Sequence, residues 1–152
     1  MVKKLADEFK IKVAEVRTGA KYDTWIDILS PNHALGGEND TNTDSLVLEL
    51  RLKTQRVLVL SDVPAEIQNR LAHPEIGEFS CVIVAHHGAR SQSEKLASIV
   101  KPQISLISVG KNNYGHPHPN AFRVWNAPLI KTTQNCGDIR IGAKQYATQK
   151  KC

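Results

Sequence analysis

The sequence predicts a single α/β (α+β) domain in which helices flank a mixed β-sheet. Two apolar runs, 82–85 and 104–109, each lead into a glycine-containing loop and are separated by a helix-like segment, which is typical of buried strands. Earlier segments alternate polar and apolar residues, which indicates half-buried strands. A length of 152 residues suits one domain, with an ordered core over about 10–142 and a loose tail over 143–152.

The first half of the chain is expected to supply four strands. The segment 45–52 alternates cleanly and is joined by a short turn to the apolar run that follows, so these two strands form a hairpin. Pro31 ends the strand before them, and the loop over 32–44 is the most polar stretch of the chain. The expected strands are 10–16, 24–29, 45–52 and 56–60.

The second half is expected to alternate helices and strands. Pro64 suits the first turn of a helix that runs to about Leu71, and Pro102 ends a second helix. The expected helices are 64–71, 92–100 and 120–125. The expected strands are 81–85, 104–109, 129–132 and 138–141.

The composition indicates in which compartment the protein resides and which partners it can bind. No apolar run reaches the roughly 18–20 residues that span a bilayer, and the N-terminus lacks the apolar core of a signal peptide, so we expect a soluble, cytoplasmic chain. Three cysteines without metal-ligand spacing favour a reducing compartment over a disulfide framework. The net charge of +5 agrees with a nucleic-acid partner, but solvated lysine-rich ends are the favoured explanation.

Four of the six histidines follow two of the predicted strands. His86 and His87 come directly after the apolar run 82–85, and His116 and His118 lie in the loop after 104–109. Asp62 follows the strand 56–60 in the same way. Imidazole and carboxylate groups suit zinc, manganese or iron, and paired metals activate water for hydrolysis. The residue types alone leave two other interpretations, a histidine bonded to backbone and an aspartate that caps a helix.

Several short segments occur in one order over roughly 110 residues, which is more specific than any single motif. The segments are Leu29-Ser30-Pro31, Asn39-Asp40-Thr41-Asn42 with Ser45-Leu46-Val47-Leu48, the strand 57–62, AHHG and the following residues of 85–93, ISVG with NNYGHP in 107–117, and the closing turn 132–139. In that order they resemble the metallo-β-lactamase fold, and most closely the hydrolase-like domain of ComEC-type DNA-uptake (competence) proteins. Ser61 stands where that family usually has glycine.

The resemblance implies roles for the polar residues. Asp62 would bridge two metal ions, zinc or manganese, and one of His86 and His87 would be a ligand while the other lies beside the substrate. His116 would stabilise the charged transition state or protonate the leaving group. The residues implied to border the substrate are His118, Tyr114 and Asn42, with Asp40 as an alternative to Asn42.

One departure from the family changes the functional expectation. The main metal cluster of that family, H-x-H-x-D-H, is absent, so the chain resembles only the second half of such a domain. We expect a hydrolase half-domain that is inactive alone and, once completed, cleaves nucleic acid or another phosphodiester. A non-catalytic binding or assembly module is the alternative, and an enzyme completed across a homodimer is a third possibility. Half of that sandwich leaves one sheet face uncovered, so we expect a homodimer or a separate first-half partner.

Overall fold

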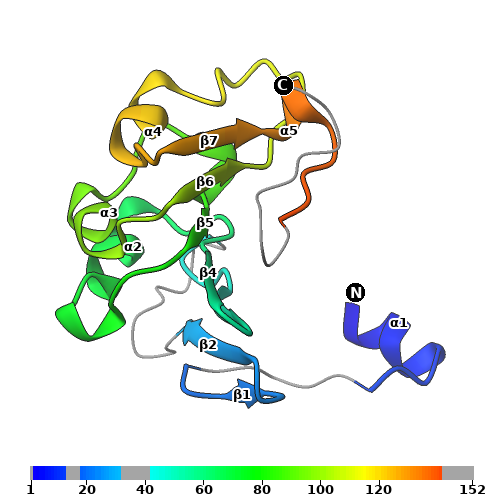
Figure 1. Ribbon diagram of the computed structural model, residues 1–152. Helices are drawn as coiled ribbons and strands as arrows, with labels where there is room; N and C mark the ends of the chain where they lie inside the picture. The colour runs from blue at the N-terminus through cyan, green and yellow to red at the C-terminus, as the bar shows by residue number, and fades with distance from the viewer. Residues whose placement is uncertain (1, 13–17, 32–41, 142–152) are drawn as a thin grey trace.

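The structure, a computed structural model, describes residues 2–12, 18–31 and 42–141. Its centre is a seven-stranded mixed sheet whose strands lie side by side in chain order (Figure 1). Strands β1 to β4 pair antiparallel, whereas β4 to β7 pair parallel. The predicted α/β class and mixed sheet are therefore confirmed. The strands are β1 (Lys21–Tyr22), β2 (Ile26–Ser30), β3 (Val47–Leu52), β4 (Gln55–Val59), β5 (Cys81–Ile83), β6 (Ile104–Ile107) and β7 (Leu129–Thr132).

Helical segments connect the parallel strands and lie together on one side of the sheet (Figure 1). This follows from strand order, because right-handed crossovers that all step in one direction place their helices on the same face. The α-helices are α1 (Val2–Glu8), α2 (Ala65–Leu71), α3 (Glu94–Val100), α4 (Pro119–Val124) and α5 (Thr133–Cys136), and the 3-10 turns are η1 (Pro74–Ile76) and η2 (Ala85–Gly88).

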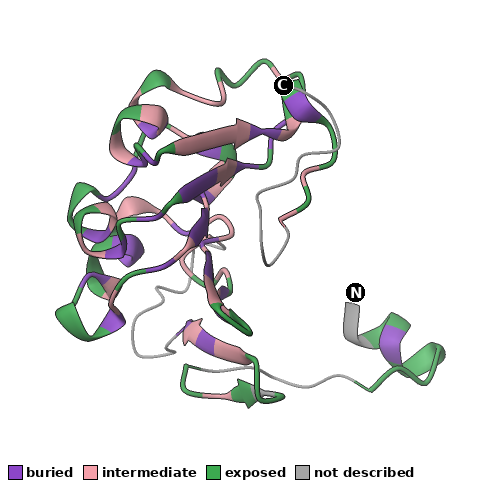
Figure 2. Cartoon of the chain, viewed as in Figure 1, coloured by how far each residue is buried: buried purple, intermediate pink, exposed green. Residues whose placement is uncertain are grey.

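The main core lies between the sheet and these helices (Figure 2). Leu58 and Val82 from the sheet meet Leu96 from α3, and all three side chains are fully buried. The buried Trp125 donates its indole N–H to Gln92 Oε1 at 2.9 Å. Gln92 in turn donates to the Ala85 carbonyl at 3.2 Å. This chain of contacts fixes the loop after β5 to the helical layer.

The opposite face of the sheet carries a second apolar cluster. Strand pairing places Val57, Cys81 and Ile104 side by side, and these three are buried. The next row, Val59 with Ile83 and Leu106, is only partly buried. None of the described helices contributes a residue to this cluster. The described helical layer therefore covers one face of the sheet and not the other.

Most expected elements are present, with ends shifted by at most two residues, but the first and last expected strands differ from the structure. The expected strand 10–16 is wrong where it can be checked, because residues 10–12 are not in a strand; its remainder lies outside the described residues. The expected strand 138–141 reduces to a single bridge at Ile139. Helix α1, strand β1 and helix α5 were not expected. The tail 143–152 lies outside the described residues.

The cysteines differ from the sequence expectation. Cys81 is free and buried, and burial raises the pKa of its thiol to about 12. Cys136 is disulfide-bonded, which contradicts the expectation of a chain without disulfides. The cysteines thus give no support to a reducing compartment. None of the described helices has the length and apolar character needed to span a membrane.

Candidate functional site

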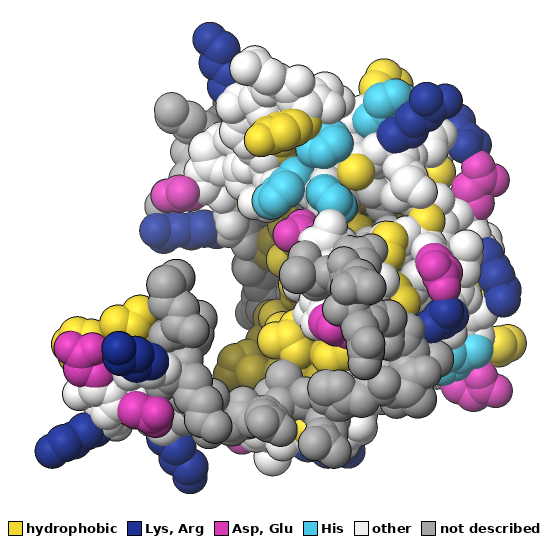
Figure 3. All heavy atoms as spheres, turned by 180° about the vertical axis from the view of Figure 1, so that it is seen from behind, with side chains coloured by type: hydrophobic (Ala, Val, Ile, Leu, Met, Phe, Trp, Pro, Cys, Tyr) yellow, Lys and Arg dark blue, Asp and Glu magenta, His cyan; other side chains and the backbone are white. Residues whose placement is uncertain are grey.

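The predicted polar residues gather at one rim of the sheet, where the parallel strands end. Asp62 follows β4, His86 and His87 lie in η2 after β5, and His116 lies in the loop after β6. Parallel neighbouring strands deliver their carboxyl ends to the same edge, so residues far apart in sequence meet there. Figure 3 shows histidine side chains gathered there beside an acidic side chain. We call this group (Asp62, His86, His87 and His116) the histidine rim.

Asp62 is held at the rim by its neighbour rather than by a helix. Ser61 has a left-handed backbone (φ 44°), and its hydroxyl donates to the Leu46 carbonyl at 2.5 Å. The Ser61 carbonyl accepts the His86 N–H at 2.8 Å, which joins the two strand ends. The N-cap of α2 is Pro64, without a side-chain cap. The alternative in which Asp62 serves only as a helix cap is therefore wrong.

His87 has one ring nitrogen engaged and the other directed toward Asp62. Its Nδ1 lies 2.7 Å from the Ser108 carbonyl oxygen. A carbonyl oxygen can only accept a hydrogen bond, so Nδ1 must be the nitrogen that carries the proton. In the neutral ring Nε2 then keeps its lone pair. Nε2 lies 3.8 Å from Asp62 Oδ1. Histidines that bind metals commonly have their other ring N–H held by a backbone carbonyl or carboxylate in this way.

The backbone of η2 is held in an uncommon conformation. His86 and His87 both have left-handed backbones, with φ of 51° and 52°. This region disfavours residues with a Cβ, at roughly 1–2 kcal/mol per residue. The conformation turns both imidazoles onto the rim directly after the strand ends. Local strain of this kind is concentrated at functional sites.

Replacing His86 tests whether this strain is present. His86→Gly should be more stable to urea than His86→Ala by about 1 kcal/mol, because both variants lose the imidazole and only alanine retains the Cβ penalty. Ser98, exposed within α3, provides the control, because there glycine should be less stable than alanine by a similar amount. Equal stability of the two His86 variants would contradict a strained rim.

Loop 110–118 is shaped by one asparagine that sequence reasoning missed. Asn112 Nδ2 donates to the Gly110 and His116 carbonyls at 2.9 and 2.7 Å. Its Oδ1 accepts the N–H groups of Tyr114 and His116 at 3.0 and 3.1 Å. Two of these four bonds hold the backbone of His116, and the other two hold Gly110 and Tyr114. The Asn-Asn-Tyr-Gly composition, typical of turns, was the available signal.

His116 has one ring nitrogen that is shielded from solvent. Its Nδ1 is buried without a hydrogen-bond partner, and its ring lies edge-on to that of His86 with centroids 5.9 Å apart. Burial, followed by the positive charges of the other rim histidines and His118, lowers the pKa of His116 below its usual value. His116 is therefore neutral at pH 7 and can offer one N–H donor to an oxyanion.

The three residues expected to border the substrate lie in different surroundings. Tyr114 is 84% exposed and stacks on His116 with centroids 6.3 Å apart. Both line a cavity of about 210 Å³ with His87 and Lys111. His118 caps α4, since its Nδ1 accepts the Asn120 N–H at 3.1 Å.

Of the two residues expected from the polar loop, only Asn42 is described. It lies in a turn before β3, and the segment that follows reaches the rim through the Leu46 carbonyl beside Ser61. Asp40 lies outside the described residues. Whether either residue contacts a substrate stays a prediction.

The rim fits a divalent metal in part. Two ligands with bonds of about 2.0–2.1 Å and a tetrahedral angle are separated by about 3.4 Å, close to the 3.8 Å between His87 Nε2 and Asp62 Oδ1. The described residues hold no group of three or more histidine, cysteine or carboxylate side chains positioned for one ion. Within the described residues the rim therefore falls short of a stable zinc site, which needs three or four ligands.

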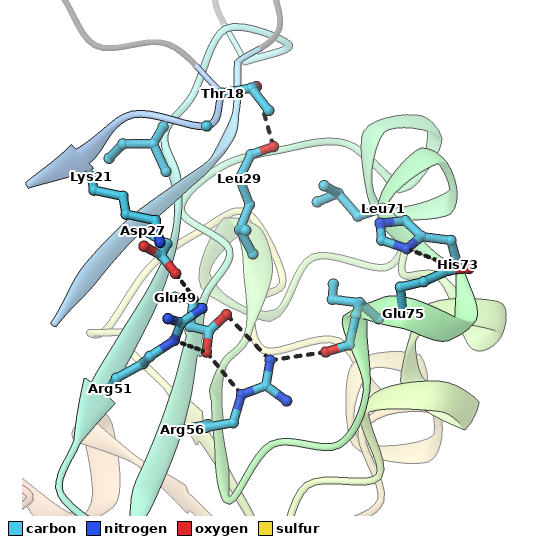
Figure 4. Close-up of a pocket in the computed structure, with 13 residues that line it drawn as sticks. Thr18, Lys21, Asp27, Leu29, Glu49, Arg51, Arg56, Leu71, His73 and Glu75 are labelled. Carbon is cyan, nitrogen blue, oxygen red and sulfur yellow. Dashed lines mark hydrogen bonds and ion pairs between the residues drawn. The ribbon is translucent and has the colours of Figure 1, made fainter. Parts of the chain in front are cut away.

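A second cavity, of about 410 Å³, lies away from the rim, between β2, β3 and the segment that joins α2 to β5 (Figure 4). Glu49 is buried there and accepts hydrogen bonds from Arg51 Nε at 2.9 Å and Arg56 Nε at 2.8 Å. Burial acts to raise the pKa of Glu49, but these bonds and the two positive charges outweigh it and lower the pKa. The buried carboxylate in this cluster is paired with two arginines, so we assign the cluster a role in the stability of the fold.

Comparisons with known proteins do not identify the chain. A scan against protein-family models and a search of curated proteins each found no match. The resemblance to metallo-β-lactamase and ComEC-type domains therefore stays a prediction.

Proposed function

We propose that the histidine rim is one half of a divalent metal site in a hydrolase-like half-domain of the metallo-β-lactamase type, related to DNA-uptake proteins. One observation carries the proposal: His87 Nε2 faces Asp62 Oδ1 at 3.8 Å while its Nδ1 is fixed by the Ser108 carbonyl. Asp62 and His87 are the ligands in this proposal, with zinc or manganese as the ion. A bound divalent ion supplies a Lewis acid and an acidified water for hydrolysis.

The other rim residues supply what a phosphodiester substrate needs. His116, neutral and with its Nδ1 buried, is suited to donate a hydrogen bond to an oxygen that gains negative charge. His86 lies against it and forms the wall of the same site. Lys111 lines the adjoining cavity and offers a positive charge to a phosphate. Together they favour phosphodiesters, nucleic acid included, as the substrate class.

The chain alone is expected to be inactive, because two ligands do not hold a catalytic ion firmly. The same small number of ligands favours the second candidate, a binding or assembly module that retains the rim residues but does not catalyse a reaction. The two candidates differ in one property. A completed hydrolase gains metal-dependent activity when the missing ligands are supplied, whereas a binding module does not.

Metal titration tests the half-site. We expect the purified chain to bind zinc or manganese with a dissociation constant weaker than micromolar, measured by calorimetry. Asp62→Asn and His87→Ala should each weaken binding at least tenfold. His73→Ala is the matched control, because His73 is a half-exposed histidine outside the rim that pairs with Glu75, and it should leave binding unchanged.

Two results would overturn the proposal. Micromolar or tighter binding of two ions per chain would show a complete site rather than half of one. Equal weakening by His73→Ala and His87→Ala would show binding to scattered surface histidines.

A further inference from the structure

The cavity of about 210 Å³ beside the histidine rim has one exposed aromatic ring in its wall. Tyr114 is 84% exposed, and its ring stacks on that of His116 with 29° between the two planes. One face of the tyrosine thus lies toward His116, while most of the ring stays open to solvent. A lone exposed aromatic is ordinary on a protein surface, but one that lines a cavity among a few polar groups is typical of a ligand site.

The loop fixes the position of Tyr114 through its backbone. Asn112 Oδ1 accepts the N–H groups of Tyr114 and His116 at 3.0 and 3.1 Å. Gly115, between them, has a left-handed backbone (φ +78°), which lets the chain turn so that the two rings can stack. A ring that is already held in place loses little conformational freedom when a ligand packs on it.

Most polar groups in the wall of this cavity are bonded within the chain. The Val109 N–H donates to Thr133 Oγ1 and the same hydroxyl donates to the Val109 carbonyl, both at 2.8 Å. Asn112 uses both ends of its amide to build the loop. Lys111 adds an exposed positive charge. The wall therefore offers a flat aromatic surface and a cation, and few groups that distinguish one hydrogen-bonding pattern from another.

We propose that this cavity binds one nucleobase of a single-stranded nucleic acid, with the base stacked on Tyr114. Aromatic rings combined with positive charge bind single strands, because every base has a π-face and every nucleotide a phosphate. His87 and His116 belong to both the cavity and the rim, so a base in the cavity lies directly beside the rim. The placement of the adjoining phosphate at the rim rests on the proposed function, whereas the stacking does not.

The geometry favours single strands over duplexes. Stacking on Tyr114 needs a base with an uncovered face, and in a duplex each base is paired and stacked between its neighbours, so freeing one costs energy. Because the wall has few groups that read the edge of a base, the site should accept all four bases. A phosphodiester without a base lacks the ring that stacks.

Fluorescence anisotropy of the full chain with a labelled oligothymidylate of about ten nucleotides tests the site, at low salt and in EDTA so that no metal takes part. Tyr114→Ala should weaken binding at least fivefold, as expected for the loss of a stacking ring, and Tyr114→Phe should retain the affinity. Trp25→Ala is the matched control, because Trp25 is an exposed aromatic in the turn before β2, at the opposite end of the sheet from the rim. It should leave binding unchanged.

An abasic strand of the same length separates stacking from a change in the loop. Its phosphates are intact but it has no rings, so the unaltered chain and Tyr114→Ala should bind it equally. A duplex of the same length should likewise be insensitive to Tyr114→Ala. Lys111→Ala, in contrast, should weaken binding of the abasic strand and of oligothymidylate by the same factor, because contacts to phosphate do not depend on the bases.

Three results would overturn this inference. They are no binding of oligothymidylate at low salt, unchanged binding in Tyr114→Ala, and equal weakening of the base-bearing and abasic strands in that variant, which would show that the tyrosine only shapes the loop. Asp62→Asn should not weaken binding in EDTA, so the metal half-site is tested separately. Stacking without metal binding would reject the proposed function alone, whereas metal binding without any dependence of strand binding on Tyr114 would reject this inference alone.

Discussion

Arg56→Ala should lower the free energy of unfolding by about 2–3 kcal/mol at pH 7, the largest effect expected for a charged residue here. Arg56 contacts Glu49 through two nitrogens, at 2.8 and 3.2 Å, and its guanidinium also donates to the Ile76 and Glu78 carbonyls. It stacks on Phe79 at 4.2 Å. Removing it leaves a buried carboxylate short of partners, which typically costs about 3–5 kcal/mol; partial exposure of Arg56 reduces that figure.

The pH dependence of the free energy lost in Arg56→Ala shows whether Glu49 is the cause of that loss. The folded pKa of Glu49 lies below its usual 4.5, so its contribution is fully present above that pH and is lost as the pH falls through the folded pKa. The deficit of Arg56→Ala should accordingly shrink as the pH falls below about 4.5, because the stabilisation that ionised Glu49 gains from Arg56 declines from that pH down to the folded pKa. Urea unfolding at pH 7 and pH 3.5 measures it.

A surface ion pair gives the control. Arg123 pairs with Glu94, and both side chains are more than 60% exposed, so Arg123→Ala should cost less than about 1 kcal/mol. A deficit in Arg56→Ala that stays constant between the two pH values would contradict the assignment to Glu49 and leave only the lost packing on Phe79.

Gly88→Ala should lower the free energy of unfolding by about 3 kcal/mol and shift the histidine loops apart. Gly88 has a φ of +79°, and a Cβ there would lie 2.9 Å from Pro117 Cβ and 3.0 Å from Ile107 Cγ2. Overpacking of this kind costs roughly 1–3 kcal/mol, and the left-handed backbone adds about 1–2 kcal/mol. Because Pro117 follows His116 directly in the chain, the displacement moves His116 away from the other residues of the rim.

Stability and site geometry are measured separately for this variant. Urea unfolding gives the free energy, and the imidazole NMR signals of the rim report the displacement. Gly115→Ala is the control, because Gly115 has a similar φ of +78° but a Cβ there meets nothing within 4 Å. Gly115→Ala should cost only the backbone contribution of about 1–2 kcal/mol. Equal effects of the two variants would show that the close approach to Pro117 does not matter.

Local patterns were sufficient for the middle of the chain. Alternation at 45–52 predicted a strand of the hairpin, and Pro64 and Pro102 marked one end of each of two helices. The same patterns failed at the ends. The short strand β1 has only two residues, too few to show any period, and α5 has four. The expected strand over 138–141 has the right residue types, but whether such a segment pairs depends on its neighbours.

The candidate site was predictable in its members and not in its geometry. Polar residues at strand ends pointed to Asp62, His86, His87 and His116, and parallel pairing then brought them to one rim. The protonated nitrogen of His87 depends on the Ser108 carbonyl, 21 residues away, and no local pattern encodes that contact. Asn112 was missed for a related reason, because its role lies in the turn it builds and not in a motif of its own.

The order of the strands has a consequence for folding. Each strand of the sheet pairs with the next strand in the chain, so every pairing closes a loop no longer than one helical crossover. Loops of that length carry a modest entropic cost, and proteins rich in such contacts fold faster than those that pair distant segments. The sheet can therefore assemble strand by strand as the chain leaves the ribosome, with its apolar face formed before the last strand is in place.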